Sequence, residues 1–140
     1  MKLFLSLLVF CFCSFQKNIS AQSWQPIKLT VSGNNVIDSV EAFFQLTNCY
    51  GKDVVFIKFV NQNTSRVVVQ WQDAVFTKEL KWINREHSPE VKSVTLESHS
   101  EITGDCGGKE IVVVPLNNFI ANVNEFKLYG VNQFAVKRQM

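Results

Sequence analysis

The chain has 140 residues, of which 46% are hydrophobic and 19% are charged, and its formal net charge is +2. This length predicts one folded domain with its own hydrophobic core. So small a charge excludes the basic surplus typical of nucleic-acid-binding proteins and gives little attraction to anionic membranes. The sequence also has no glycine-rich phosphate-binding motif and no G-x-S-x-G motif, so nothing favours a nucleotide-binding protein or a serine hydrolase of that type.

The first 21 residues predict a secretory signal peptide. Lys2 supplies a positive start, an uncharged apolar run covers 3–15, and the segment ends in small residues at Ala21. The apolar run is shorter than the roughly 20 residues that cross a bilayer, so a cleaved signal is favoured over the alternative, an uncleaved anchor. We therefore expect a secreted or periplasmic protein, with residues 22–140 as a single domain that has no transmembrane segment.

Removal of the signal changes both the charge and the cysteine count. Lys2 and Lys17 leave with it, so twelve basic and twelve acidic residues remain and the formal charge is zero. Of the four cysteines only Cys49 and Cys106 remain, each beside turn-forming residues. Two cysteines in an exported domain usually pair, and we predict a Cys49–Cys106 disulfide. The alternatives are two free thiols or half of a metal site.

The first half of the exported part reads as short strands separated by polar turns. Hydrophobic and polar residues alternate over 27–31, 40–46 and 67–71, as in strands with one buried face. The run 54–60 is almost continuously apolar, as in a central strand covered on both faces. Because only the short polar segment 61–65 separates the two, we predict that 54–60 and 67–71 pair as a hairpin.

The second half is less regular. Residues 74–83 fit either a helical turn or an edge strand, and 116–123 fit a short helix or a loop. Strands are expected over 94–98 and 111–114, with a glycine-rich turn between them. One or two final strands follow over 126–136.

The whole pattern, seven or eight short strands at turn spacings of about ten residues, predicts an all-β fold. We expect an antiparallel β-sandwich, with a small β-barrel as the alternative. In strand count the chain resembles the immunoglobulin-like sandwich. It lacks the antibody-domain signature, because Cys49 and Cys106 stand at strand ends and Trp71 lies on the fourth segment, so the resemblance implies no function.

One polar segment could carry metal or acid–base chemistry. On a strand, Glu97, His99 and Glu101 would share one face, and two carboxylates beside an imidazole can bind a metal or tune a base. The same pattern fits a solvent-facing polar strip, which we prefer. Cys106 in its glycine-rich turn is better explained by a disulfide than by a nucleophile. We therefore predict no catalytic residue, no metal and no cofactor.

The aromatic residues give the best indication of a binding surface. A domain this small leaves some of them exposed, and exposed aromatic side chains bind glycans or protein partners. Trp82 and Phe76, in the ambiguous middle segment, are the first candidates, and Trp24 is the next. Ordinary core packing is the alternative. Separately, Asn63 begins an Asn-Thr-Ser sequon in a turn that we expect to be exposed, as N-glycosylation requires.

The sequence as a whole favours an exported, non-catalytic module that binds a protein or a cell-surface component such as a glycan. A small secreted hydrolase or metal-dependent enzyme is the alternative. An inhibitor or structural component of a secreted assembly is a third possibility. No nucleic acid is expected among the partners.

Overall fold

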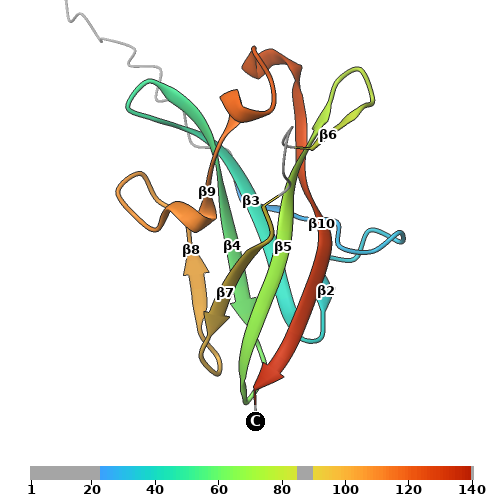
Figure 1. The fold of residues 1–140 in the computed structure, drawn as a ribbon, viewed down its shortest axis with the longest axis vertical. Helices are drawn as coiled ribbons and strands as arrows, with labels where there is room; N and C mark the ends of the chain where they lie inside the picture. Colours follow the sequence, from blue (N-terminus) through green and yellow to red (C-terminus); the bar gives the residue numbers. More distant parts are fainter. Residues whose placement is uncertain (1–22, 85–89, 140) are drawn as a thin grey trace, which may run out of the picture.

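The computed structural model describes residues 23–84 and 90–139, and the signal peptide predicted over 1–21 lies outside them. The described residues form two antiparallel sheets that face each other (Figure 1). They contain no α-helix, and the two sheets do not close into a barrel. The antiparallel β-sandwich predicted from the sequence is therefore confirmed.

Sheet A is built on a hairpin of two ten-residue strands, β3 (Val40–Cys49) and β4 (Lys52–Asn61). Tyr50 and Gly51 connect them with φ angles of 51° and 83°. Positive φ at both positions is the geometry of a tight two-residue hairpin turn. The other strands of sheet A are short: β1 (Gln25–Pro26) and β2 (Val36–Ile37) pair with β3, and β8 (Glu101–Thr103) and β9 (Val113–Pro115) pair with β4.

Sheet B is built in the same way on a long pair, β5 (Arg66–Thr77) and β10 (Phe126–Gln139). The free edge of β5 is shared by two short strands, β6 (Trp82–Asn84) and β7 (Lys92–Leu96). Each sheet therefore consists of two long strands with short strands along both edges of the pair in sheet A and along one edge in sheet B. Five of the ten strands in the described residues have only two or three residues, which explains why seven or eight are counted from the sequence.

The segments that the sequence left open have clear structures. Residues 74–83 contain the end of β5, a turn and the start of β6, which is the edge-strand alternative. Residues 116–123 contain the short 3₁₀ turn η2 (Leu116–Asn118) and lead into η3 (Val123–Glu125). A third such turn, η1 (Glu110–Val112), precedes β9.

Two strand predictions are wrong, and the strand expected over 111–114 begins only at Val113, because Ile111 and Val112 belong to η1. Residues 54–60 and 67–71 do not pair, because β4 belongs to sheet A and β5 to sheet B. The chain crosses between the sheets at 62–65, and the hairpin partner of β4 is β3. Residues 27–31 are not a strand either: only Gln25–Pro26 pairs with β3, and Val31 is fully exposed in a loop.

The core lies between the sheets and uses the inward residues that alternation predicts. Val67, Val69 and Trp71 of β5 are fully buried. The Trp71 ring meets Phe59 of β4 edge-on, at 4.7 Å between ring centres, so the two sheets interlock through aromatic side chains. In β4, Val54–Ile57 is buried on both faces, as the continuous apolar run predicts.

Buried asparagines hold the end of the sandwich where β4 leaves sheet A. Asn61 Nδ2 donates to the carbonyls of Ser65, Leu96 and Glu97, at 3.1, 3.3 and 2.9 Å. Asn63 Nδ2 donates to Asn61 Oδ1 and to the Asp38 carbonyl, at 3.0 and 2.8 Å. Asn63 is only 7% exposed. The expectation of an exposed sequon is therefore wrong, because this side chain is buried and links its own turn to the turn at Asp38.

The predicted disulfide is confirmed at the opposite end of β3. Cys49 and Cys106 are bonded, with 5.4 Å between their Cα atoms. Cys49 is the last residue of β3, and Cys106 lies in the loop between β8 and η1. The bond therefore links the loop between β8 and η1 to the end of β3 that lies at the β3–β4 turn.

Candidate functional site

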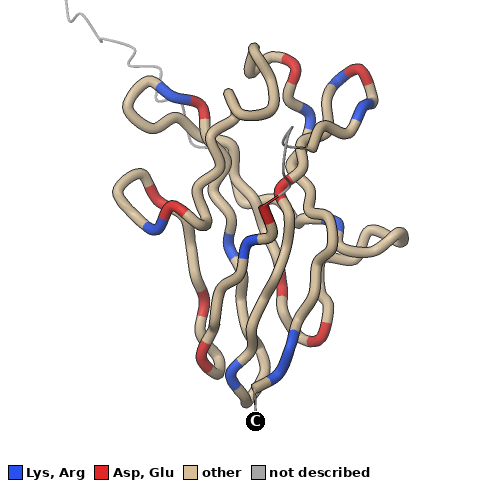
Figure 2. The backbone as a smooth tube through the Cα atoms, in the orientation of Figure 1, with Lys and Arg blue, Asp and Glu red and all other residues tan. Residues whose placement is uncertain are grey.

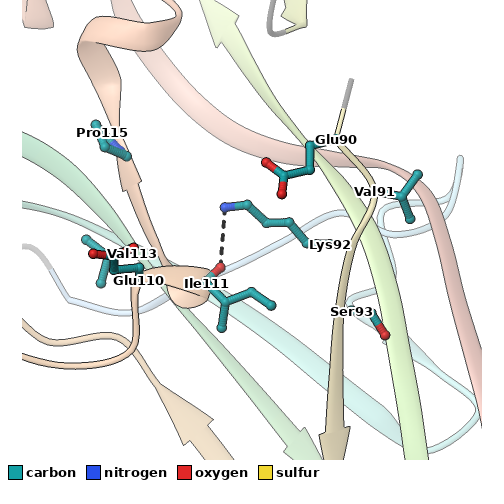
Figure 3. A pocket seen from close by; sticks show the side chains of 8 residues that line it. All are labelled: Glu90, Val91, Lys92, Ser93, Glu110, Ile111, Val113 and Pro115. Atoms are coloured by element: carbon teal, nitrogen blue, oxygen red, sulfur yellow. Dashed lines mark hydrogen bonds between the residues drawn. The ribbon is translucent and has the colours of Figure 1, made fainter. Parts of the chain in front are cut away.

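A cavity of about 650 Å³ opens along one side of the sandwich, between the start of β7 in sheet B and η1 with β9 in sheet A. Figure 3 shows Lys92 reaching across this space toward the carbonyl oxygen of Ile111, to which Nζ donates a hydrogen bond of 3.3 Å. The lining combines four apolar residues with two carboxylates, one ammonium group and one hydroxyl. Its residues are Glu90, Val91, Lys92, Ser93, Glu110, Ile111, Val113 and Pro115.

A polar network lies beside this cavity. Lys92 Nζ is 2.6 Å from Asp73 Oδ2, and the two side chains are only 14% and 10% exposed. Asp73 Oδ1 accepts hydrogen bonds from the Tyr129 hydroxyl at 2.5 Å and from Trp71 Nε1 at 3.0 Å. Both carboxylate oxygens are therefore engaged, and the network joins β5, β7 and β10. An ion pair with this many partners is compensated for its burial.

The network also affects the acidity of Tyr129. This side chain is fully buried. Burial, together with the nearby Asp73 charge and the hydrogen bond to it, raises the pKa of Tyr129 well above its ordinary value. The hydroxyl therefore stays protonated and acts as a donor to Asp73. The arrangement is an ion pair between Lys92 and Asp73 whose carboxylate also accepts two hydrogen bonds. These contacts suit a structural role, in which the network links the three strands.

The residues considered for metal binding do not share a strand face. β7 ends at Leu96 and β8 begins at Glu101, so the expected strand is interrupted by a turn in which His99 has a φ of 52°. Glu97 forms an exposed ion pair with Arg66 at 2.9 Å. Among the described residues, no three His, Cys, Asp or Glu side chains are grouped so that they could hold a metal ion. The geometric premise of the metal hypothesis is therefore wrong.

The structure brings Trp82 and Phe76 together on the outer face of sheet B. They are opposite one another in β6 and β5. Their ring centres are 4.9 Å apart with 42° between the planes. Lys127 Nζ lies 5.6 Å from the centre of the Phe76 ring at the margin of this pair. Trp82 is 55% exposed, so the pair presents an aromatic surface to solvent.

The position of the Trp82 ring depends on a glycine in the next long strand. A Cβ atom at Gly130 would come within 2.5 Å of the Trp82 ring, so the indole lies directly against the backbone of β10. Gly130 does not interrupt β10, which continues through it. Beside the ring, Asn132 Nδ2 donates to Asn84 Oδ1 at 2.6 Å. The aromatic pair, Gly130 and these two amides form what we call the Trp82 surface.

Trp24 lies on the other side of the molecule, over the outer face of sheet A. It packs against a small apolar cluster that includes Phe56 and Cys49. Lys58 Nζ lies 4.7 Å from the centre of its ring and 4.9 Å from that of Phe43. Trp24 is half-buried, so the three binding candidates do not form one surface. Only Trp82 and Phe76 are brought together.

Sequence reasoning missed Asp73, Lys92 and Tyr129, although one of them carries a readable signal. Asp73 follows Val67, Val69 and Trp71 at the same spacing of two residues. The alternation therefore places a charged side chain on the face of β5 that points into the core. A charge in that position requires a partner. Gly130 could also have been noticed, since a glycine inside a strand often marks a close approach.

No known protein family matches this chain, and neither the curated proteins nor the solved structures include a match. Within the described residues, no helix is both long enough and apolar enough to cross a membrane.

Proposed function

We propose that the chain is an exported binding module that holds its ligand, a protein or a cell-surface component, against the Trp82 surface. The observation that carries this proposal is a half-exposed indole that is fixed in place by Phe76 and Gly130. A binding surface gains from such fixing, because a side chain that is ordered in advance loses less entropy when the ligand binds. Trp is also the residue type most enriched among the residues that dominate binding energy.

Export is supported by the Cys49–Cys106 bond. Structural disulfides form and persist in oxidising compartments and are rare in the reducing cytosol. The apolar N-terminal segment with its positive start supports the same assignment.

The test compares binding to the cell-envelope fraction of the producing cells between the purified protein and two variants. Trp82→Ala should lower the bound fraction by about tenfold or more. Tyr50→Ala removes an aromatic ring that is 90% exposed in the β3–β4 turn and should bind like the wild type. Equal binding by the Trp82→Ala variant would refute the proposal.

A further inference from the structure

We propose that the Trp82 surface binds a neutral pyranose ring of a cell-surface polysaccharide, with the C–H face of the sugar on the indole and its hydroxyls on Asn84 and Asn132. This inference rests on the proposed function and names the ligand class. It follows from the shape, the hydrogen-bonding groups, the charge and the size of the surface.

The shape follows from how the indole lies. The outer edge of the Trp82 ring, at Cη2 and Cζ3, lies against Gly130, where even a methyl group would collide with it, and Phe76 packs beside the ring. The side chain is nevertheless 55% exposed, so the indole still presents apolar surface to solvent. A flat apolar surface next to hydrogen-bonding groups matches a pyranose, which has an apolar face of C–H groups and a rim of hydroxyls.

The hydrogen-bonding groups are the two amides. Their mutual bond uses one Nδ2 hydrogen of Asn132 and the Oδ1 of Asn84. Asn84 Nδ2 and Asn132 Oδ1 have no other partner among the described residues, and both side chains are exposed. A donor and an acceptor thus lie side by side. Neighbouring sugar hydroxyls, each of which can donate and accept, complement such a pair.

The charge around the surface favours a neutral ligand. Opposite Trp82 and Asn84, and further along the same face, the outward positions of the long strands are apolar or carry amides: Gln70, Gln72, Ala74 and Phe76 in β5, and Leu128, Gly130 and Asn132 in β10. Lys127 is the charged group that contacts the aromatic pair. Many of the charged positions lie in the loops instead (Figure 2).

The size of the surface favours a sugar over a protein. A stable protein interface buries about 800 Å² on each partner, whereas a whole Trp side chain contributes at most about 250 Å². The other large exposed hydrophobic residues of the described chain lie in turns and loops: Leu80 in the turn that precedes β6, and Val31, Tyr50 and Val91 in other segments. One aromatic pair with two amides matches the footprint of a single sugar ring.

The experiment uses the envelope fraction after one of two treatments. Periodate cleaves the vicinal diols of sugar rings, and protease digests exposed proteins. We expect binding to survive protease, to be lost after periodate, and to stay constant between about 0.05 and about 0.5 M salt, since screening does not weaken neutral contacts. Binding that survives periodate but not protease would assign a protein ligand and overturn the inference, as would binding that falls steeply with salt.

Four variants separate this inference from the proposed function. Trp82→Phe keeps a smaller ring and should retain part of the binding, whereas Trp82→Ala should lose it. Asn132→Leu should lower polysaccharide binding about tenfold, and Trp24→Ala should leave it unchanged. One outcome is that Trp82→Ala abolishes binding, while the binding of the wild type is lost after protease and not after periodate. In that case the proposed function holds with a protein ligand, and the sugar assignment fails. If Trp82→Ala has no effect, both fail.

Discussion

The two sheets present their outer faces differently. On sheet A, Trp24 packs over the face with Lys58 beside its ring, and the disulfide-linked loop reaches the same apolar cluster. On sheet B, Trp82 stands half-exposed over Gly130. The same residue type covers one sheet and remains uncovered on the other. This difference teaches that a large aromatic residue indicates a binding surface only where its own packing leaves much of the ring exposed.

The sheets are also fastened differently. Sheet A is closed by a covalent bond between Cys49 and the loop that holds Cys106. In sheet B, three strands meet at Asp73 through hydrogen bonds and an ion pair. The stability that the disulfide adds to sheet A should depend on reductant. The stability that the Asp73 network adds to sheet B should depend on pH and on the presence of each polar partner.

Loss of the covalent fastening should have the largest effect. A Cys49→Ser, Cys106→Ser double variant frees a loop with a sequence separation of 57 residues, which corresponds to about 4 kcal/mol of stability in the chain-entropy account. Urea unfolding measures it, with reduced wild-type protein as the control. A loss below about 1 kcal/mol would show that the bond adds little to the closure of sheet A.

Loss of Asp73 should come next. Asp73→Ala leaves the Lys92 ammonium and the Tyr129 hydroxyl without their acceptor beside the core and should cost about 3 kcal/mol, measured by urea unfolding. Glu97→Ala breaks an exposed ion pair, whose side chains are 52% and 66% exposed, and should cost about 1 kcal/mol or less. Similar losses for the two variants would contradict the role of the network in sheet B.

Alkaline pH should weaken sheet B through Tyr129. The pKa of Tyr129 is raised in the folded protein, so the unfolded chain ionises first, near its ordinary pKa of about 10. Stability is therefore complete below that pH and falls as pH rises toward the folded pKa, by at most about 1.4 kcal/mol per pH unit. Unfolding temperatures between pH 9 and pH 11 should fall less for Tyr129→Phe than for the wild type. Parallel curves would refute this.

The smallest effects should come from the two exposed-face tryptophans, and their ratio tests the comparison directly. Trp24→Ala removes packing over Phe56 and should cost about 1–2 kcal/mol, whereas Trp82→Ala should cost less than about 1 kcal/mol. Acrylamide quenching of fluorescence should fall most for Trp82→Ala, since Trp71 is fully buried. Equal stability losses would mean that both rings serve packing.

The sequence predicts which residues face the core better than it predicts which strands pair. Alternation in β5 correctly places Val67, Val69 and Trp71 inside, because burial follows a period of two. The pairing of β4 with β3 rather than β5 depends on whether the chain turns within a sheet or crosses to the next. Both links are short. Positive φ at Tyr50 and Gly51 distinguishes the true hairpin turn.

The candidate site was predicted in part. Trp82 and Phe76 could be chosen as aromatic residues in a segment whose secondary structure the sequence leaves open. Their contact, however, follows from the register of β6 on β5. Gly130 and Asn132 are some 50 residues further along and reach the same surface only through the pairing of β10 with β5. No local pattern carries such a long-range pairing.

The buried Asn63 has a consequence for producing the protein. In a eukaryotic secretory pathway, sugar is attached to sequons while the chain is still unfolded, and Asn63-Thr64-Ser65 is such an acceptor. An attached oligosaccharide would replace an Nδ2 hydrogen that Asn63 uses for its contacts to Asn61 and Asp38. A chain modified in this way cannot close the turns at that end of the sandwich. Expression in a host without N-glycosylation avoids this obstacle.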